Sequence, residues 1–337
     1  CSPGSEASSD PTLCDQWSVR GEVDVNAADQ KYNQQGSGTA FEAVVEYGTA
    51  GVGQLGIYMV NFQSFKAGEF NVSMTLNGSH IGNSPALVTI LPDVTDTLSC
   101  TANGTGSNQY GLAVAEAGAP GEFIVVSRDV YGNARLIGGE SFEVSMQGEE
   151  HSDWYFEYMA GELDLPPKAD GTPREIGVNR LDATVVDNGD SSYSATYQVT
   201  VAGKFRTEVK RDGEHIRGSP FVTMVDASAT DGATCTAQGN GVSGGVAGES
   251  FELDIQAKDI YYNDQTKPGD NFTVVLQGTE AHNLDRIKLI STDFEGSGVY
   301  AAQYNNTVSG FYTLTITMEG EHIIGSPFEF TVEPDTT

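Results

Sequence analysis

Three histidines recur in one short motif, and their residue type could bind a metal or transfer a proton. The motif reads GSHIGNSPA, GEHIRGSPF and GEHIIGSPF, with the histidines at His80, His215 and His322. Histidine ligands and catalytic bases act together with other ligands or partner groups held close to them. None of the three has a cysteine or a second histidine nearby in the sequence. The motif therefore predicts a structural or surface role for each histidine.

A second repeated element places a carboxylate and an amide four residues apart. Its copies are Asp29 with Asn33, Asp129 with Asn133, and Asp259 with Asn263. Such side chains at a domain tip could hold calcium, but they also close turns by bonding the backbone two residues on. No D-x-[DN]-x-[DN]-G loop is present. The element is therefore interpreted as a turn; calcium has no supporting motif, and no metal site or cofactor is predicted.

Nothing else in the sequence indicates catalysis. There is no G-x-S-x-G elbow, no H-E-x-x-H, no glycine-rich phosphate loop, and no Cys and His arranged as nucleophile and base. The chain has 47 acidic and 17 basic residues, which gives a net charge of -30. The negative electrostatic field of such a protein repels nucleic acids and anionic lipids. No apolar run is long enough to span a membrane. We expect a non-enzymatic protein with no nucleic-acid partner and no direct membrane insertion.

The elements that must position these motifs are predicted to be strands. In SFEVSMQG the apolar residues are Phe142, Val144 and Met146, and NFTVVLQG, from Asn271, alternates in the same way. Period two is typical of an antiparallel strand with one face on a core. Short strands of this kind, separated by Gly, Asn and Pro, indicate β-sandwiches of about 100 residues. The predicted fold class is all-β.

Spacing divides the chain into three tandem units. Each histidine follows an aromatic residue by ten positions, and a glycine precedes that aromatic by two. The predicted domains are residues 1–95, 96–229 and 230–337. The first is shortened, since nine residues separate Gly48 from Tyr58 where 21 separate Gly278 from Tyr300. We expect one of its middle strands to be shortened or missing.

The GSPF segment predicts a tight corner before the last strand of a unit. Gly218 and Gly325 are expected to supply a positive φ, and Asn83 is a tolerable replacement in the first unit. Phe221 and Phe328 are expected to enter the core at the start of that strand.

Together, the aromatic strand, the G-x-aromatic step and G-x-HI-x-GSPF resemble the filamin-type immunoglobulin-like repeat over nearly the whole chain. The first unit departs from the pattern at Asn83 and Ala86. The resemblance implies three tandem immunoglobulin-like β-sandwiches, of the kind found in secreted or cell-surface proteins of algae, plants and protists. In this family, partners bind by adding a strand to a sheet edge. Animal filamins are cytoplasmic actin crosslinkers, but nothing here is similar to their helical actin-binding head.

Four cysteines are disulfide candidates. They are Cys1, Cys14, Cys100 and Cys235. Pairing of Cys1 with Cys14 is feasible, whereas the second and third units each have one cysteine and cannot hold an internal disulfide. Cys100 and Cys235 are therefore free, buried at a joint, or bonded to another chain; a folded-back arrangement is the remaining alternative.

Five N-glycosylation sequons bear on localisation. They are Asn71, Asn77, Asn103, Asn271 and Asn305. Strand alternation points Asn71, Asn271 and Asn305 outward, where a glycan has room. With few lysines and strong acidity, the sequons favour an extracellular or cell-surface protein; the alternative is cytoplasmic.

The second unit contains an insertion at about 149–190, where 42 residues replace 20 in the third. Its aromatic cluster supplies candidate partner contacts: Trp154, Tyr155, Phe156, Tyr158 and Met159. Long loops with aromatic residues often mark contact sites, although these side chains could instead cover the edge of their own sheet.

These observations predict a structural or adhesive array of immunoglobulin-like domains on a cell surface or in an extracellular assembly. Its partners would be proteins, either copies of itself or cell-surface molecules. The alternative is an intracellular filamin-type scaffold that binds extended peptides by strand addition.

Overall fold

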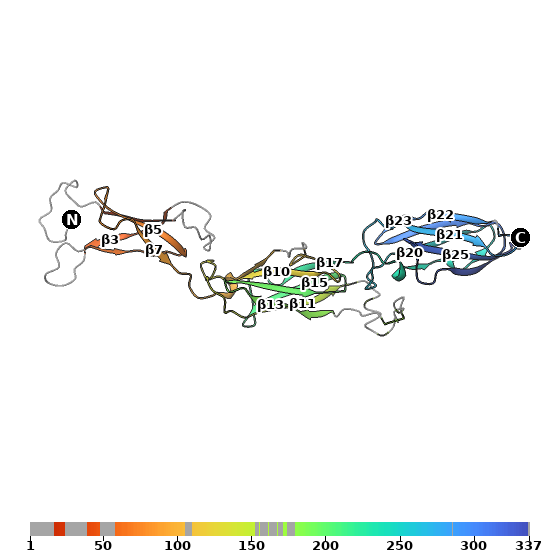
Figure 1. Cartoon of the computed structure of the whole chain (residues 1–337), viewed down its shortest axis with the longest axis horizontal. Coiled ribbons are helices and arrows are strands. Elements are labelled where there is room, and N and C mark those ends of the chain that lie inside the picture. Colours follow the sequence, from red (N-terminus) through yellow and green to blue (C-terminus); the bar gives the residue numbers. More distant parts are fainter. Residues whose placement is uncertain are drawn as a thin grey trace.

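The computed structural model describes residues 17–23, 39–47, 58–104, 110–151, 155, 161, 167, 171–173, 179–284 and 286–335. Nearly all regular structure in these residues is β-strand, which confirms the predicted fold class. The strands form three successive units that follow one another in a row (Figure 1). Among the described residues, no helix has the length and hydropathy of a membrane span.

The second unit is a sandwich of two sheets. The four-stranded sheet has the order β13-β14-β10-β8, and the six-stranded sheet has the order β12-β11-β15-β17-β9 with β16 beside β15. The bounds are β8 Thr101–Asn103, β9 Val114–Glu116, β10 Pro120–Val126, β11 Phe142–Glu150, β12 Arg180–Asp182, β13 Thr184–Asp187, β14 Ser192–Gln198, β15 Gly203–Arg211, β16 Glu214–His215 and β17 Phe221–Asp226. A 3-10 turn at Thr97–Ser99 precedes β8.

The third unit repeats this plan strand for strand. Its sheets have the orders β18-β20-β24-β23 and β19-β27-β25-β21-β22, with β26 beside β25. The bounds are β18 Thr236–Gln238, β19 Gly245–Val246, β20 Ser250–Gln256, β21 Phe272–Gly278, β22 Ile287–Ile290, β23 Asp293–Gly296, β24 Val299–Asn305, β25 Gly310–Met318, β26 Glu321–His322 and β27 Phe328–Glu333. The 3-10 turns are Gly232–Thr234 and Asn240–Val242.

The first unit departs from the plan. Its strands are β1 Trp17–Val23, β2 Thr39–Glu42, β3 Val44–Tyr47, β4 Tyr58–Asn61, β5 Gly68–Leu76, β6 Ser79–His80 and β7 Ala86–Ile90. Here β1 lies between β2 and β5, whereas its counterparts β10 and β20 belong to the opposite, four-stranded sheet. The four-residue β2 is too short to cover the nine-residue β5, and β1 pairs with seven of its residues instead.

The cores confirm the alternation read from the sequence. Phe142, Val144 and Met146 of β11 are 6%, 3% and 0% exposed, and the aromatic residues of β14 and β24 also point inward. Each core draws side chains from both sheets. Burial of one large apolar side chain contributes roughly 1.5–3 kcal/mol, so these positions carry most of the stability of a unit.

One sheet edge of each complete sandwich is closed by its own chain. β12 pairs with β11, and β22 pairs with β21 at the corresponding place. β12 and β13 lie within the range of the predicted insertion, so part of that segment forms ordinary strands of the sandwich. The edges of β11 and β21 are therefore already paired.

The GSPF corner holds two strands together through one serine. The hydroxyl oxygens of Ser84, Ser219 and Ser326 accept from the backbone N–H ten residues earlier, at 2.7, 2.9 and 2.9 Å. The same oxygens bond Nδ1 of the histidine four residues earlier, at 2.8, 2.8 and 3.0 Å. The histidines therefore have a structural role.

The backbone of this corner agrees with the prediction, but its phenylalanines do not. Gly218, Gly325 and Asn83 have φ of 85°, 82° and 64°. Phe221 and Phe328 were expected inside the core and are only partly buried, packed against it. Their rings lie over Gly218 and Gly325, where the missing Cβ leaves room at the rim of the sandwich.

Candidate functional site: the joints between units

The Asp-x-x-x-Asn element of the second unit forms a closed turn between β10 and β11. Oδ1 of Asp129 accepts from the backbone N–H of Tyr131 at 3.0 Å and of Asn133 at 2.8 Å. Oδ2 accepts from Nδ2 of Asn133 at 2.8 Å. The predicted turn interpretation is correct, and the turn presents the Asn133 amide outward from its own unit.

That amide is bonded to the first unit. Oδ1 of Asn133 accepts from the N–H of Ala67 at 3.0 Å, and Nδ2 donates to the carbonyl of Phe65 at 3.0 Å. One side-chain amide thus pairs with the backbone on both sides of a residue, as a neighbouring strand would. The rings of Phe65 and Tyr131 lie beside this pair, with centroids 5.0 Å apart.

The joint between the second and third units uses the same contacts. Oδ1 of Asn263 accepts from the N–H of Ala202 at 2.9 Å, and Nδ2 donates to the carbonyl of Thr200 at 2.8 Å. Asp259 closes its turn on Tyr261 and Asn263 at 2.9 and 2.8 Å. Two joints with the same donors and acceptors indicate a built interface.

The linker is tied to the same carboxylates. Oδ2 of Asp129 accepts from the N–H of Asp93 at 3.0 Å, and Oδ2 of Asp259 accepts from the N–H of Ser228 at 2.9 Å. Both carboxylates are buried, at 1% and 0% exposure. Burial raises the pKa of Asp259, although hydrogen bonds from Asn263 and Ser228 oppose the shift. Each aspartate therefore joins three segments: its turn, the linker and, through its asparagine, the preceding unit.

The second joint has additional packing. Tyr262 is 7% exposed and belongs to the core cluster of the second unit, with Tyr261 packed beside it. A Cβ at Gly118 would overlap the Tyr261 ring, so the two units are in direct contact there. Lys267 and Asp226 also form an exposed ion pair of 2.8 Å across the joint.

Calcium at these tips is not supported. The oxygens of Asp129 and Asp259 are directed at N–H groups, and a cation would have to displace those donors. No group of three or more His, Cys, Asp or Glu suited to a metal occurs in the described residues.

The two cysteines in described regions are free and buried. Cys100 and Cys235 are both 0% exposed, and their Sγ atoms lie 3.3 Å from the carbonyl oxygens of Asp96 and Asp231. Both follow the linker directly, within their own unit. Of the predicted alternatives, this arrangement matches free, buried thiols; Cys1 and Cys14 lie outside the described residues.

Strand alternation pointed three of the five sequons outward, Asn71, Asn271 and Asn305, and none of these three side chains is buried. Asn77, Asn103, Asn271 and Asn305 are exposed, and Asn71 is half-buried on the outer face of β5. Their glycosylation stays a prediction.

The aromatic cluster of the insertion is represented by Tyr155, which is 1% exposed and part of the core cluster. As a partner contact, Tyr155 is therefore contradicted by its burial. Its ring packs against His151 with centroids 4.8 Å apart, and Nδ1 of His151 bonds the carbonyl of Ala202 at 2.9 Å. The start of the insertion thus supports the turn that receives Asn263. Trp154, Phe156, Tyr158 and Met159 lie outside the described residues.

The joint contacts were missed by sequence reasoning because their partners are backbone groups. The sequence did hold one clue to these partners, since the dipeptides Ala67-Gly68 and Ala202-Gly203 occur at matching positions of the first and second units. Nothing in residue type links them to an asparagine more than 60 positions later.

The fold and joints define a tandem array of immunoglobulin-like β-sandwiches. The Filamin/ABP280 repeat family matches residues 94–222 and 229–329. The chain therefore belongs to the family of filamin repeats.

Curated relatives agree with this assignment. Filamin-A of Drosophila melanogaster is 29% identical over 169 residues, covering 49% of this chain and 7% of the relative. Filamin-C of Rattus norvegicus is 24% identical over 177 residues, covering 52% and 6%. The chain thus spans less than a tenth of the length of either. Both relatives are from animals, so the expected likeness to algal, plant or protist proteins is unsupported.

Solved structures are similar at low identity. The Escherichia coli adhesin FdeC has a TM-score of 0.45 and 18% identity, covering 82% of this chain and 77% of the adhesin chain. Invasin, a bacterial integrin-binding protein, has a TM-score of 0.41 and 14% identity, covering 96% and 60%. The Lin-41 filamin domain has a TM-score of 0.27 and 15% identity, covering 32% and 98%. At these values, none of the three carries an argument about function.

Substitution of Asn263→Ala is expected to loosen the second joint. It removes both interunit bonds of the amide, a loss of about 1–3 kcal/mol, and also the bond from its Nδ2 to the buried Asp259 carboxylate, while the cores stay intact. Small-angle X-ray scattering should show a broader distance distribution and a more flexible profile. The matched control is Asn240→Ala, because its amide bonds Ser250 and Glu252 within one unit. Identical scattering from both variants and the parent would contradict a clamping role for Asn263.

The buried thiols are expected to resist alkylation. Burial raises the pKa of Cys235 to about 11, from a usual value of 9.0, so its thiolate fraction at pH 8 falls about 100-fold. Burial also raises the pKa of Cys100. Peptide-resolved mass spectrometry after iodoacetamide treatment should find both unmodified in the folded protein and labelled in guanidinium. An exposed thiol introduced by Thr184→Cys serves as the reactive control, and rapid native labelling of Cys235 would refute its burial.

Proposed function

We propose that this chain is a non-enzymatic spacer: a line of filamin-type sandwiches, on a cell surface or in an extracellular assembly, that mediates protein–protein contacts. The observation that carries the proposal is the repeated joint, in which Asn133 and Asn263 bond the preceding unit through the same atoms. Flexible linkers alone would let the units reorient. The joints instead favour an extended row in which the distance between the two ends is maintained (Figure 1).

Surface chemistry supports the extracellular part of the proposal. Four of the five sequons are exposed, and the fifth is half-buried on an outward strand face. The net charge of -30 opposes folding of one unit back onto another, which suits a protein that must stay extended. Its filamin-repeat membership is consistent with a role in protein contacts.

The second candidate is an intracellular filamin-type scaffold that binds extended peptides by strand addition. The curated filamin relatives favour it. The pairing of β12 with β11 and of β22 with β21 weighs against strand addition at the edges of β11 and β21, because only the outer edges of the short strands β12 and β22 are left there for a peptide.

Glycan analysis separates the two candidates. Mass spectrometry of protein isolated from its natural source should find N-glycans at Asn71, Asn271 and Asn305, because Asn71 and Asn305 lie on outer strand faces and Asn271 is exposed just before β21. Complete absence of modification at all three would favour the intracellular scaffold and overturn the extracellular proposal.

The insertion remains our proposed contact segment through Trp154, Phe156, Tyr158 and Met159. Replacing these four with serine, while keeping the buried Tyr155, is expected to reduce self-association or cell binding without changing the thermal midpoint. Sedimentation velocity, cell binding and thermal melting measure the three properties. Tyr155→Ser is the comparison variant and should lower the midpoint instead. Unchanged association and cell binding in the fourfold variant would remove the segment as the contact site.

A further inference from the structure

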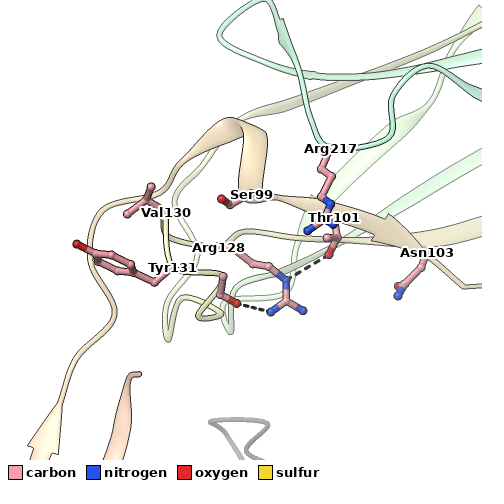
Figure 2. Close-up of a pocket in the computed structure, with 8 residues that line it drawn as sticks. Ser99, Thr101, Asn103, Arg128, Val130, Tyr131 and Arg217 are labelled. Carbon is pink, nitrogen blue, oxygen red and sulfur yellow. Dashed lines mark hydrogen bonds between the residues drawn. The ribbon is translucent and has the colours of Figure 1, made fainter. Parts of the chain in front are cut away.

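A hollow of about 450 Å³ opens beside the first joint, on the surface of the second unit. Its walls come from the turn before β8, from β8 itself, from the Asp-x-x-x-Asn turn and from the HI-GSP corner. The residues that line it are Ser99, Thr101, Asn103, Arg128, Val130, Tyr131, Gly132 and Arg217 (Figure 2). The volume falls within the usual range for small-ligand sites.

Two arginines converge on this hollow. Arg128 is held in place by bonds from Nε to Oγ1 of Thr101 at 3.3 Å and from Nη1 to the carbonyl of Gly132 at 2.8 Å. Arg217 extends toward the same strand from the HIRGSPF corner, as Figure 2 shows. No carboxylate side chain is among the described residues that line the hollow. In a chain with 47 acidic and 17 basic residues, two arginines in one hollow with no carboxylate among its described lining residues are a marked local exception.

Neither guanidinium forms an ion pair with another described residue. Arg128 keeps N–H donors beyond the two that bond Thr101 and Gly132, and the Arg217 side chain is exposed. Guanidinium groups present several donors in a plane that matches the two oxygens of a carboxylate. The hollow is therefore equipped to receive an anionic group.

In the third unit, the residues equivalent to those of the hollow satisfy one another. Lys258, at the position of Arg128, forms an ion pair with Asp264 and lies 4.2 Å from the ring centroid of Tyr262. Ile324 stands at the position of Arg217. The second unit has Ala134 and Gly132 where the third has Asp264 and Tyr262. It therefore lacks both the internal carboxylate and the covering ring.

We propose that the hollow binds a glutamate or aspartate side chain from an acidic peptide segment of a partner protein. Arg128 and Arg217 would hold the carboxylate. Val130 and Tyr131, which are 59% and 53% exposed, offer an apolar wall for the aliphatic part of the segment. Arginine and tyrosine together are typical of the residues that dominate protein–protein contacts.

The neighbouring strand favours a peptide over an acidic saccharide. β8 is the edge strand of its sheet and contributes Thr101 and Asn103 to the hollow. An extended peptide beside it could bond its backbone while one side chain enters the hollow. A saccharide has no matching backbone groups.

The test uses the full chain and three fluorescent probes: hexaglutamate, hexaglutamine and a hexamer of galacturonic acid. Fluorescence anisotropy at 150 mM salt, where the Debye length is about 8 Å, limits the effect of the distant negative charges. We expect hexaglutamate to bind and hexaglutamine not to bind. Arg217→Gln and Arg128→Gln should each weaken binding at least about tenfold, the loss of a charged hydrogen bond. Arg180→Gln, an equal charge change on β12, should leave binding unchanged.

A further variant tests the site without removing an arginine. Ala134→Asp supplies the internal carboxylate that the third unit has, and should also weaken hexaglutamate binding at least tenfold, whereas Thr184→Asp on β13 should not. Equal binding of the two peptides, no binding of hexaglutamate, or no effect of Arg217→Gln would overturn the proposal. Preference for the galacturonic acid hexamer would overturn the choice of a peptide. None of these outcomes bears on the spacer function, because these variants leave the side chains and backbone groups of the joint hydrogen bonds in place.

Discussion

The arrangement of the chain depends on satisfying a buried carboxylate at each joint. Asp129 and Asp259 are almost fully shielded from water, and an unpaired charge there would be strongly destabilising. Their donors come from the turn, the linker and the asparagine amide, so meeting this requirement also fixes the linker and turns the amide toward the preceding unit. The two interunit bonds contribute only about 1–3 kcal/mol. Packing therefore decides how stiff each joint is.

The two joints differ in how their side chains pack. Tyr262 adopts a left-handed φ of 76°, where Gly132 has 83° at the matching position of the first joint. A bulky residue in this region costs of order 1–3 kcal/mol, which is offset because the ring is buried against the second unit. The first joint has the glycine at this position, and its ring contact is that of Phe65 with Tyr131, both exposed. We therefore expect the second joint to be the stiffer. The insertion reinforces it, since His151 holds the Ala202 carbonyl beside the Asn263 contact.

Local patterns predicted the sandwiches, because inward residues such as Phe142 and Phe272 alternate along one strand and need no knowledge of the rest of the chain. The turn at Asp129 was also readable, since it closes on residues two and four positions later. The joint could not be predicted from the sequence, because Asn133 bonds backbone groups that any residue carries. The burial of Tyr155 agrees with the alternative that the aromatic side chains of the insertion cover their own unit. Which of them would be buried was not readable, because the contact with the core depends on where the chain returns, which residue type does not encode.

The second repeat carries both halves of a joint, one at each of its ends. The second unit bonds backward through Asn133 and is bonded in turn at Ala202 by the third. A gene segment that encodes one whole repeat therefore brings a complete pair of connectors with it. Duplication or loss of such a segment would change the reach of the molecule in fixed steps, and no new interface would have to evolve. Length is thus a property that recombination can adjust without disturbing the fold of any one repeat.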